Sequence, residues 1–209
     1  CYETNVIGSM NVARACVAGG VRRCVGVSTD KACRAVTAYG ASKLAMEKLF
    51  QAQSVEPCIF TLVRYGNVVA SNGSVIPIWR QQAKEGKPLT VTRKDATRFW
   101  MGETEAVRLI EHAAEMPAGT VTIPKMRSLS LEELARIIAP GSDLVEVGFR
   151  SVEKLHEDLV HEDERASDTF SHIILSDIGP ARLNYTSYAA PRLTPQAFRS
   201  MLSEAEAHE

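Results

Sequence analysis

The chain has 209 residues, of which 45% are hydrophobic and 23% charged, and its formal net charge at pH 7 is −1. These values are those of an ordinary globular protein with one sizeable core, or one core and a small lobe. The near-zero charge and the lack of any apolar run of about 18 residues argue against nucleic-acid and membrane partners. Five cysteines and five histidines show no metal-ligand spacing, so we expect a cytoplasmic protein with reduced cysteines and no metal site.

Apolar periodicity and helix punctuation predict alternating helices and strands. The expected elements, in chain order, are a helix that begins after Thr4-Asn5 and ends before Gly19, a strand at 24–28, a helix from Tyr39 to about 53, a strand at 58–65, a helix at 75–85, a strand at 89–92, a helix at 103–116, a strand at 120–123, a helix opened by a capping box at Ser130, and a final helix after Thr194-Pro195. Residues 93–100 read as a charged loop, and 154–164 as an exposed charged helix that carries His156 and His161. The alternation predicts βαβ units around a parallel sheet.

A polar stretch, Ser28–Lys31, comes directly after the first predicted strand. In open α/β sheets, ligands bind at the carboxyl ends of the strands. Tyr39 and Lys43 follow on the next helix, and a spacing of four residues places the phenol and the ammonium on one helix face. An ammonium beside a phenol favours the phenolate, which a base acting on a sugar hydroxyl requires. On its own, the pair is equally compatible with an ordinary amphipathic helix.

Taken together, the two segments resemble the extended short-chain dehydrogenase/reductase family. The chain reads STDKA…YGASK, close to the STDKA…YGATK hallmark of the nucleotide-sugar 4,6-dehydratases of the polysaccharide-biosynthesis group. The resemblance extends from Thr4 to the C-terminus, is strongest from Ser28 to Ser74, and is weakest after Asp158. It implies an α/β fold: the C-terminal part of a Rossmann-like parallel sheet with a smaller α/β substrate-binding lobe.

The chain begins at Cys1 and contains no Gly-x-Gly-x-x-Gly, the turn that seats a dinucleotide pyrophosphate. Given the resemblance, we expect a fragment: the C-terminal two-thirds of such an enzyme. Residues 1–70 would form an incomplete NAD(P)-binding part that carries the catalytic residues. Residues 71–209 would be mainly the substrate-binding lobe, with about 100–124 returning to the Rossmann part.

The resemblance also implies a reaction, the 4,6-dehydration of UDP-N-acetylglucosamine to a 4-keto-6-deoxy sugar for polysaccharide or flagellin-glycan biosynthesis. Tyr39, assisted by Lys43 and Thr29, would take the 4-hydroxyl proton while hydride passes from C4 to bound NADP, with NAD as the alternative cofactor. Lys31 would then remove the C5 proton while Asp30 protonates the departing 6-hydroxyl. The presence of a tyrosine at position 39 favours the C5-inverting branch.

Further stretches resemble the family's ligand-binding segments, among them RYGNVVASNGSVIP at 64–77. The residues implied to bind cofactor are Tyr39, Lys43 and Val68. The residues implied to bind substrate are Thr29, Lys31, Asn67, Asn72, Gly73, Ser74, Val75, Ile76, Arg98, Arg150 and Glu153. The departures from the family pattern are Asn72 in place of an arginine, Arg93 and Asp95 in reversed order, and Ser151-Val152 in place of Pro-Gly.

Two alternatives stay open. A UDP-sugar 4-epimerase needs the Tyr39–Lys43 pair but has no use for a base aimed at C5. A non-catalytic remnant would explain the missing glycine turn and the departures from the family pattern. For either enzyme we expect a small-molecule UDP-sugar as partner and a homo-oligomer in the complete protein.

Overall fold

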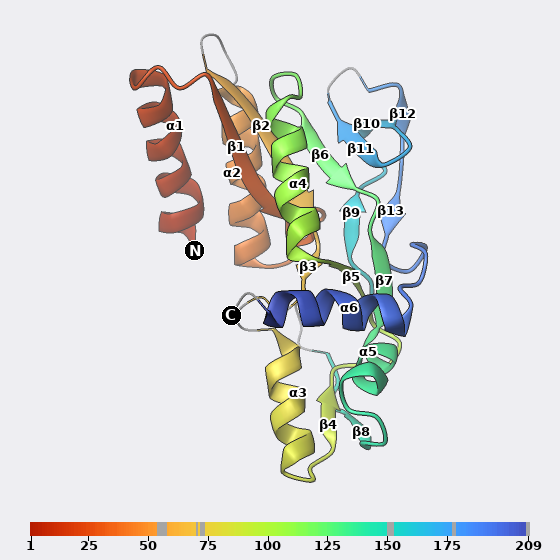
Figure 1. Cartoon of the computed structure of the whole chain (residues 1–209). Helices are drawn as coiled ribbons and strands as arrows, with labels where there is room; N and C mark the ends of the chain where they lie inside the picture. Colours follow the sequence, from red (N-terminus) through yellow and green to blue (C-terminus); the bar gives the residue numbers. More distant parts are fainter. Residues whose placement is uncertain (54–57, 70, 72–73, 150–152, 177–178, 208–209) are drawn as a thin grey trace. The chain divides into compact units, whose positions relative to one another are not determined.

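The structure, a computed structural model, describes residues 1–53, 58–69, 71, 74–149, 153–176 and 179–207. The chain divides into two compact units. Figure 1 shows the chain coloured along the sequence, from red at the N-terminus to blue at the C-terminus. The first unit comprises Cys1–Tyr65, Val107–Lys125 and Asp158–Tyr185, and the second comprises Gly66–Ala106, Met126–Glu157 and Thr186–Glu209. The segment 158–185 therefore belongs to the first unit, a return of the chain that its sequence does not reveal.

The first unit is built on a six-stranded sheet in the order β1-β2-β6-β11-β10-β12. The strands are β1 (Arg23–Thr29), β2 (Ile59–Tyr65), β6 (Val121–Pro124), β10 (Arg165–Asp168), β11 (His172–Leu175) and β12 (Ala181–Arg182). β1 pairs with β2 and β2 pairs with β6 in parallel, which confirms the predicted parallel α/β sheet. β11 runs antiparallel to β6, and β10 runs antiparallel to both β11 and β12.

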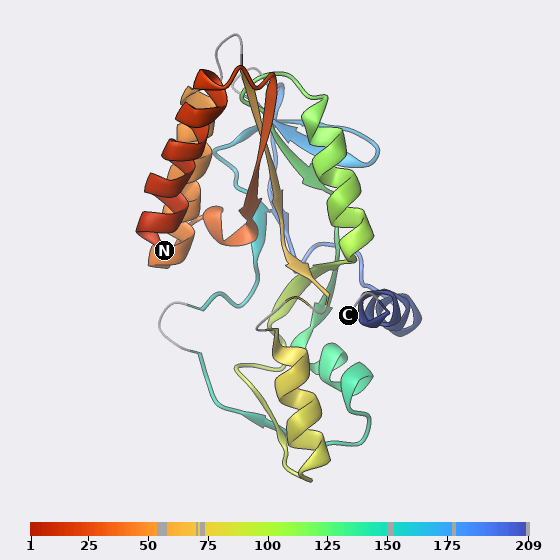
Figure 2. The same ribbon diagram turned by 60° about the vertical axis from the view of Figure 1, so that its left-hand side comes forward.

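Helices cover both faces of this sheet, as Figure 2 shows. A π-helical segment (Glu3–Gly8) leads into α1 (Ser9–Ala18), which packs on α2 (Ala38–Ala52), while α4 (Glu103–Ala114) covers the opposite face. Side chains of β2 alternate between the two faces: Phe60 meets Phe50 of α2 at 5.3 Å between ring centroids, and Thr61 Oγ1 donates to the Ala113 carbonyl at 2.8 Å. Within the described residues, no helix has the length and apolar character that a bilayer crossing requires.

Two glycines set how closely α2 approaches its neighbours. A Cβ added at Gly26 would lie 2.6 Å from the Phe50 ring, so the ring packs directly on the β1 backbone. A Cβ added at Gly40 would lie 2.2 Å from the carbonyl oxygen of Lys31, a backbone atom that cannot move aside cheaply. Thr37 caps α2 by accepting the Gly40 amide. The first turn of α2 therefore lies against the segment that follows β1.

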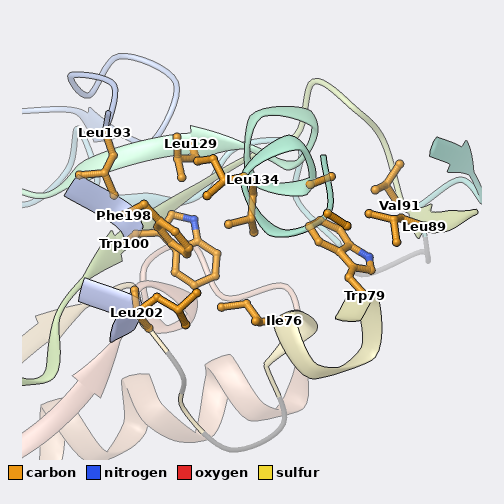
Figure 3. Close-up of a cluster of buried hydrophobic side chains, with 14 residues drawn as sticks. Ile76, Trp79, Leu89, Val91, Trp100, Leu129, Leu134, Leu193, Phe198 and Leu202 are labelled. Carbon is orange, nitrogen blue, oxygen red and sulfur yellow. The ribbon is translucent and has the colours of Figure 1, made fainter. Parts of the chain in front are cut away.

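The second unit has its own core, shown in Figure 3, in which Trp100 meets Phe198 edge-on at 5.4 Å. Its elements are β3 (Asn67–Val68), β5 (Thr97–Met101) and β7 (Arg127–Ser130) in one sheet, β4 (Leu89–Val91) and β8 (Leu144–Glu146) in another, and the helices α3 (Val75–Lys84), α5 (Leu131–Ile138) and α6 (Pro195–Glu206). The predicted capping box is confirmed, since Ser130 and Glu133 exchange their bonds at the start of α5. Thr194 caps α6 as predicted. β9 (Asp158–Val160) lies in the first unit, and β13 (Tyr185–Thr186) spans the boundary.

Three local predictions are wrong, each because a tertiary contact outweighs local preference. Thr4-Asn5 do not cap the first helix, because the chain is already helical at Glu3 and the Asn5 amide donates to Ser42 Oγ at 3.0 Å. The predicted loop at 93–100 becomes strand β5 from Thr97, paired on both sides by β3 and β7. The predicted exposed helix at 154–164 is instead the buried strand β9 followed by a turn.

A histidine pair in the first unit makes its stability depend on pH. The rings of His112, on α4, and His172, on β11, stack at 4.5 Å with 15° between their planes. Burial, and then the neighbouring charge of His112, lower the pKa of His172 below its usual value of 6.5. The unfolded state therefore binds more protons as the pH falls, and this contribution to stability is present above about pH 6.5 and lost as the pH falls through the folded-state pKa.

We predict that His172→Gln flattens this dependence, so that the free energy of unfolding falls less between about pH 7 and pH 5 than in the parent. His112→Gln removes the neighbouring charge together with the stacked ring but keeps His172, so it should give an intermediate slope. Urea denaturation followed by circular dichroism at four pH values measures the slopes. Equal slopes for the parent and His172→Gln would contradict the prediction.

Candidate active site

An aspartate–lysine pair stands at the carboxyl end of β1. Asp30 is 0% exposed, and its Oδ1 accepts from Thr29 Oγ1 and from Lys31 Nζ, both at 2.9 Å. Asp30 Oδ2 is buried and has no hydrogen-bond partner in the described part of the chain. Lys31 is partly exposed, so the pair joins a buried acid to an amine that solvent can reach. Thr29 turns its hydroxyl to Asp30, whereas its predicted role is to assist Tyr39.

The second predicted pair lies on the first turns of α2. Tyr39 is 43% exposed, and Lys43 Nζ donates to the carbonyl oxygen of Val27, in β1, at 2.6 Å. Burial lowers the pKa of Lys43, and the negative charge of Glu47 opposes that change. Among the described residues, no hydrogen bond joins the Tyr39 hydroxyl to Lys43, so the action of the ammonium on the phenol stays a prediction.

The two pairs lie at the carboxyl-terminal end of the parallel strands. They are brought there because Gly40, on α2, packs against the segment that follows β1. Tyr65 stands at the same end, since its Cα pairs with Thr29 in the register of β1 and β2. Burial, and then the charge of Tyr39, raise the pKa of Tyr65. Tyr65 was not among the predicted site residues, although its place at the end of the second parallel strand was the available signal.

A buried ion network, which was not predicted from the sequence, supports this end of the sheet. Arg64 pairs with Glu47 at 2.7 Å and with Glu164 at 2.8 Å, and Ser28 Oγ donates to Glu47 at 2.5 Å. Burial lowers the pKa of Arg64, but the two carboxylates outweigh it and the net shift is upward. For Glu164, burial raises the pKa and the bonds from Arg64 bring it below its usual value. An arginine inside an otherwise apolar strand was the signal for such a network.

The cysteines in the same unit are free thiols. Burial, and then the neighbouring Cys16, raise the pKa of Cys24 to about 12, so this thiol stays protonated at neutral pH. No group of histidine, cysteine, aspartate or glutamate residues within the described ranges is placed to hold a metal ion.

The second unit carries most of the predicted substrate-binding residues. Asn67 and Val68 form β3, opposite Trp100 and Met101 of β5. Ser74 occupies the N-cap position of α3 without a side-chain cap hydrogen bond, and the first residues of the helix are Val75 and Ile76. Their side chains pack in the hydrophobic core, so a ligand contact in this first turn would use main-chain amides, which an α-helix leaves without intrahelical partners at its start.

Arg98 lies on β5 and is largely buried. Its guanidinium donates to the carbonyl oxygens of Thr97 at 2.7 Å, Lys154 at 3.1 Å and Leu155 at 3.2 Å, and its Nε lies 3.7 Å from Glu157. These contacts hold the segment that contains Glu153, which is half-buried. In this structure the guanidinium of Arg98 donates to main-chain carbonyls of the protein itself. Its contact with a ligand therefore stays a prediction.

What remains are the departures from the family pattern and the predicted site residues Asn72, Gly73 and Arg150. Arg93 and Asp95, reversed relative to the family pattern, are both exposed and pair with each other, with Nε and Oδ1 at 2.9 Å. The residues Asn72, Gly73 and Arg150 and the pair Ser151-Val152 lie outside the described residues.

The family described as "Polysaccharide biosynthesis protein" matches residues 1–177. The chain is 40% identical over 170 residues to a UDP-N-acetylglucosamine 4,6-dehydratase (inverting) from Campylobacter jejuni, a match that covers 78% of this chain and 51% of the relative. It is 36% identical over 196 residues to a UDP-glucose 4-epimerase from Rickettsia massiliae, covering 89% of this chain and 58% of that protein. The chain thus spans about half the length of the curated relatives it matches.

Solved structures agree on the fold. The X-ray structure of Pen from Bacillus thuringiensis superposes with a TM-score of 0.85 at 29% identity, over 97% of this chain and 68% of that one. A dTDP-glucose 4,6-dehydratase from Streptomyces venezuelae, with NAD and TYD bound, gives a TM-score of 0.64 at 23% identity, over 74% of this chain and 56% of that one. With a family match over most of its length and a relative at 40% identity, the chain belongs to the polysaccharide biosynthesis protein family.

Proposed function

We propose that the whole protein is a nucleotide-sugar 4,6-dehydratase that acts on UDP-N-acetylglucosamine. The observation that carries the proposal is the direct contact of Asp30 with Lys31, 2.9 Å apart, in the segment after β1 against which the first turn of α2, with Tyr39, is packed. Loss of water across C5 and C6 of a sugar needs one base and one acid, and this pair supplies both. The similarity to the Campylobacter jejuni dehydratase supports the same reaction.

The chain's own groups account for the protons. The Tyr39 phenolate accepts the proton of the 4-hydroxyl as C4 is oxidised to the ketone. The ketone acidifies the C5–H bond; the Lys31 amine takes that proton, and the Asp30 acid gives one to the 6-hydroxyl, which leaves as water. The pair ends as an ammonium and a carboxylate, and the 2.9 Å contact lets the proton return from Lys31 Nζ to Asp30 Oδ1. This direct return resets both groups for the next turnover. Once C6 has been reduced, C5 takes a proton from solvent, and Tyr39 releases the 4-hydroxyl proton to solvent, so the protons balance over one turnover.

Hydride transfer requires a nicotinamide nucleotide, which takes hydride from C4 and returns it to C6 when bound. Tyr39, Lys43 and Val68 are the residues of this chain that would hold it, and we propose NADP, with NAD as the alternative. The exposed Tyr39 and the Lys43 ammonium, fixed on a β1 carbonyl, fit that role. These 209 residues contain no Gly-x-Gly-x-x-Gly turn for the pyrophosphate of the cofactor.

We assign the sugar nucleotide to the second unit. The start of α3, with Ser74 at its N-cap position, offers main-chain amides to a phosphate, and Asn67 and Glu153 offer polar side chains. The same assignment includes Arg98, Asn72, Gly73 and Arg150. A cytoplasmic homo-oligomer is part of the proposal.

A UDP-sugar 4-epimerase is the second candidate, because relatives of that name match 89% of this chain at 36% identity. An epimerase oxidises and reduces C4 and leaves C5 untouched. Lys31 therefore separates the two reactions.

We predict that Lys31→Met, in the whole protein, stops elimination while the Tyr39–Lys43 pair continues to oxidise C4. Incubation with UDP-N-acetylglucosamine in D₂O should give no deuterium at C5 and no 6-deoxy product by NMR. The loss should be on the order of 10²-fold or more, the range for removing a general base. Tyr39→Phe is the matched variant, and it should block the first oxidation as well.

Formation of the 4-keto-6-deoxy sugar by Lys31→Met at the parental rate would exclude Lys31 as the base. A parent that yields UDP-N-acetylgalactosamine without exchange at C5 would establish the epimerase instead. A parent that yields neither product, with its fold intact, would favour the non-catalytic remnant.

A separate prediction tests whether Arg98 binds the UDP pyrophosphate. Arg98→Lys keeps the charge but loses the planar fork that suits phosphate, so KM for the UDP-sugar should rise roughly 10-fold with a smaller change in kcat. Arg93→Lys, on the neighbouring exposed loop, is the control and should leave KM unchanged. If Arg98→Lys lowers the free energy of unfolding and leaves KM unchanged, Arg98 only holds the backbone at 154–155.

A further inference from the structure

Arg64 is a buried cation on β2, in the first unit. Its side chain contacts α2, β9 and the turn that follows β9. The side chain is 1% exposed, and its five N–H groups make five hydrogen bonds. Glu47 accepts from Nε at 3.0 Å and from Nη2 at 2.7 Å, and Glu164 accepts from Nη1 at 2.9 Å and from Nη2 at 2.8 Å. The fifth bond, from Nη1, goes to the Leu159 carbonyl at 2.9 Å.

On one side, this network holds the strand end that carries the reactive groups. Glu47 lies one helical turn after Lys43 on α2 and accepts from Ser28 Oγ at 2.5 Å. Ser28 directly precedes Thr29, Asp30 and Lys31. Because Arg64 fixes both oxygens of Glu47, it sets the position of β1 relative to α2 at this edge.

On the other side, Glu164 contacts the far end of the same segment. Its Oε2 lies 3.9 Å from Cys33 Sγ and accepts the His161 amide at 2.9 Å. Cys33 follows the short 3₁₀ turn Asp30–Ala32. The segment that contains Asp30 and Lys31 is thus contacted on both sides: Glu47 contacts Ser28 before it, and Glu164 contacts Cys33 after it.

We propose that Arg64, Glu47 and Glu164 are positioning residues that hold the Asp30–Lys31 pair in place relative to the Tyr39–Lys43 pair, an inference that rests on the dehydratase function above. The two pairs come from different elements, a strand end and a helix. They must nevertheless act on neighbouring carbons of one sugar: the Tyr39–Lys43 pair at C4, and the Asp30–Lys31 pair at C5 and C6. A displacement of about 1 Å between such groups can cost roughly 10²-fold in rate.

Glu164 is the member of the network that can be changed with least damage. It is 25% exposed and lines a pocket of about 250 Å³ together with Lys48, Asp163 and Arg165. Without its carboxylate, Arg64 keeps both bonds to Glu47, so no buried charge is left without a partner. The pocket also gives a small carboxylate such as formate a route to the vacated Arg64 donors.

The test is Glu164→Ala in the whole protein, with Glu162→Ala, exposed on the same turn, as the matched control. Glu164→Gln, which keeps the shape and loses the charge, is the second variant if the alanine variant does not fold. Amide hydrogen exchange of residues 28–43, followed by mass spectrometry, needs no substrate and should rise about tenfold only in the Glu164 variants. With substrate, kcat should fall about tenfold or more while KM stays within about twofold. Formate should restore both quantities in Glu164→Ala, and chloride at equal ionic strength should not.

Unchanged exchange and kcat in both Glu164 variants would overturn the inference. So would a rise in exchange across the whole first unit with a loss of kcat that follows the unfolded fraction, because that result describes a purely structural role. A parent without activity on UDP-N-acetylglucosamine would refute the dehydratase proposal instead. In that case, local exchange at 28–43 and its rescue by formate still decide whether the network positions this segment.

Discussion

The first unit depends on how a single buried cation is accommodated. Burying a guanidinium costs several kcal/mol, and only complete hydrogen bonding with opposite charge offsets that cost. Arg64 meets the requirement with two carboxylates and a carbonyl from two stretches of chain, α2 and the stretch that contains β9 and the turn at Glu164. Removing one partner of such a group typically costs about 3–5 kcal/mol, whereas an apolar replacement of the whole set can be neutral. The network therefore specifies one arrangement of these segments more than it adds to stability.

The same geometry explains why the reactive groups lie where they do. Side chains alternate along β2, so the position that faces α2 after Phe60 and Leu62 is Arg64. On β1, the corresponding position is Ser28, and both side chains meet Glu47. A shift of β2 by one residue would turn Arg64 to the α4 face and leave the buried Glu47 without its opposite charge, and a shift of β1 would remove the Ser28 bond in the same way.

Much of the architecture follows from local sequence. The parallel strands β1 and β2, the helix that carries Tyr39, the capping box at Ser130 and the cap at Thr194 each have a short-range physical cause, and each is found as predicted. Strand β9 could not be found in this way, because the segment around it is charged and reads as a solvated helix. Its burial depends on Arg64, which lies 95 residues from Leu159 and 100 from Glu164. An arginine in an apolar strand indicates that partners exist, but the local pattern of a single sequence does not say which distant segment supplies them.

The candidate site shows the same division between what is local and what is not. The i,i+4 spacing places Tyr39 and Lys43 on one helix, but whether Lys43 turns to the phenol or to a strand depends on packing, and here its ammonium donates to Val27. The reversed pair of Arg93 and Asp95 keeps its mutual contact, since Coulomb attraction is unchanged when two opposite charges exchange places.

The carboxylate of Asp30 has one oxygen whose state the packing of the fold does not explain. Its Oδ2 is buried without a partner among the described residues, a state that costs about 1–3 kcal/mol and that packing alone does not require. Unpaired polar groups of this kind concentrate where a protein binds or reacts. At the carboxyl end of a parallel strand, beside a lysine that solvent can reach, such an oxygen is better explained by chemistry at this edge than by the stability of the fold.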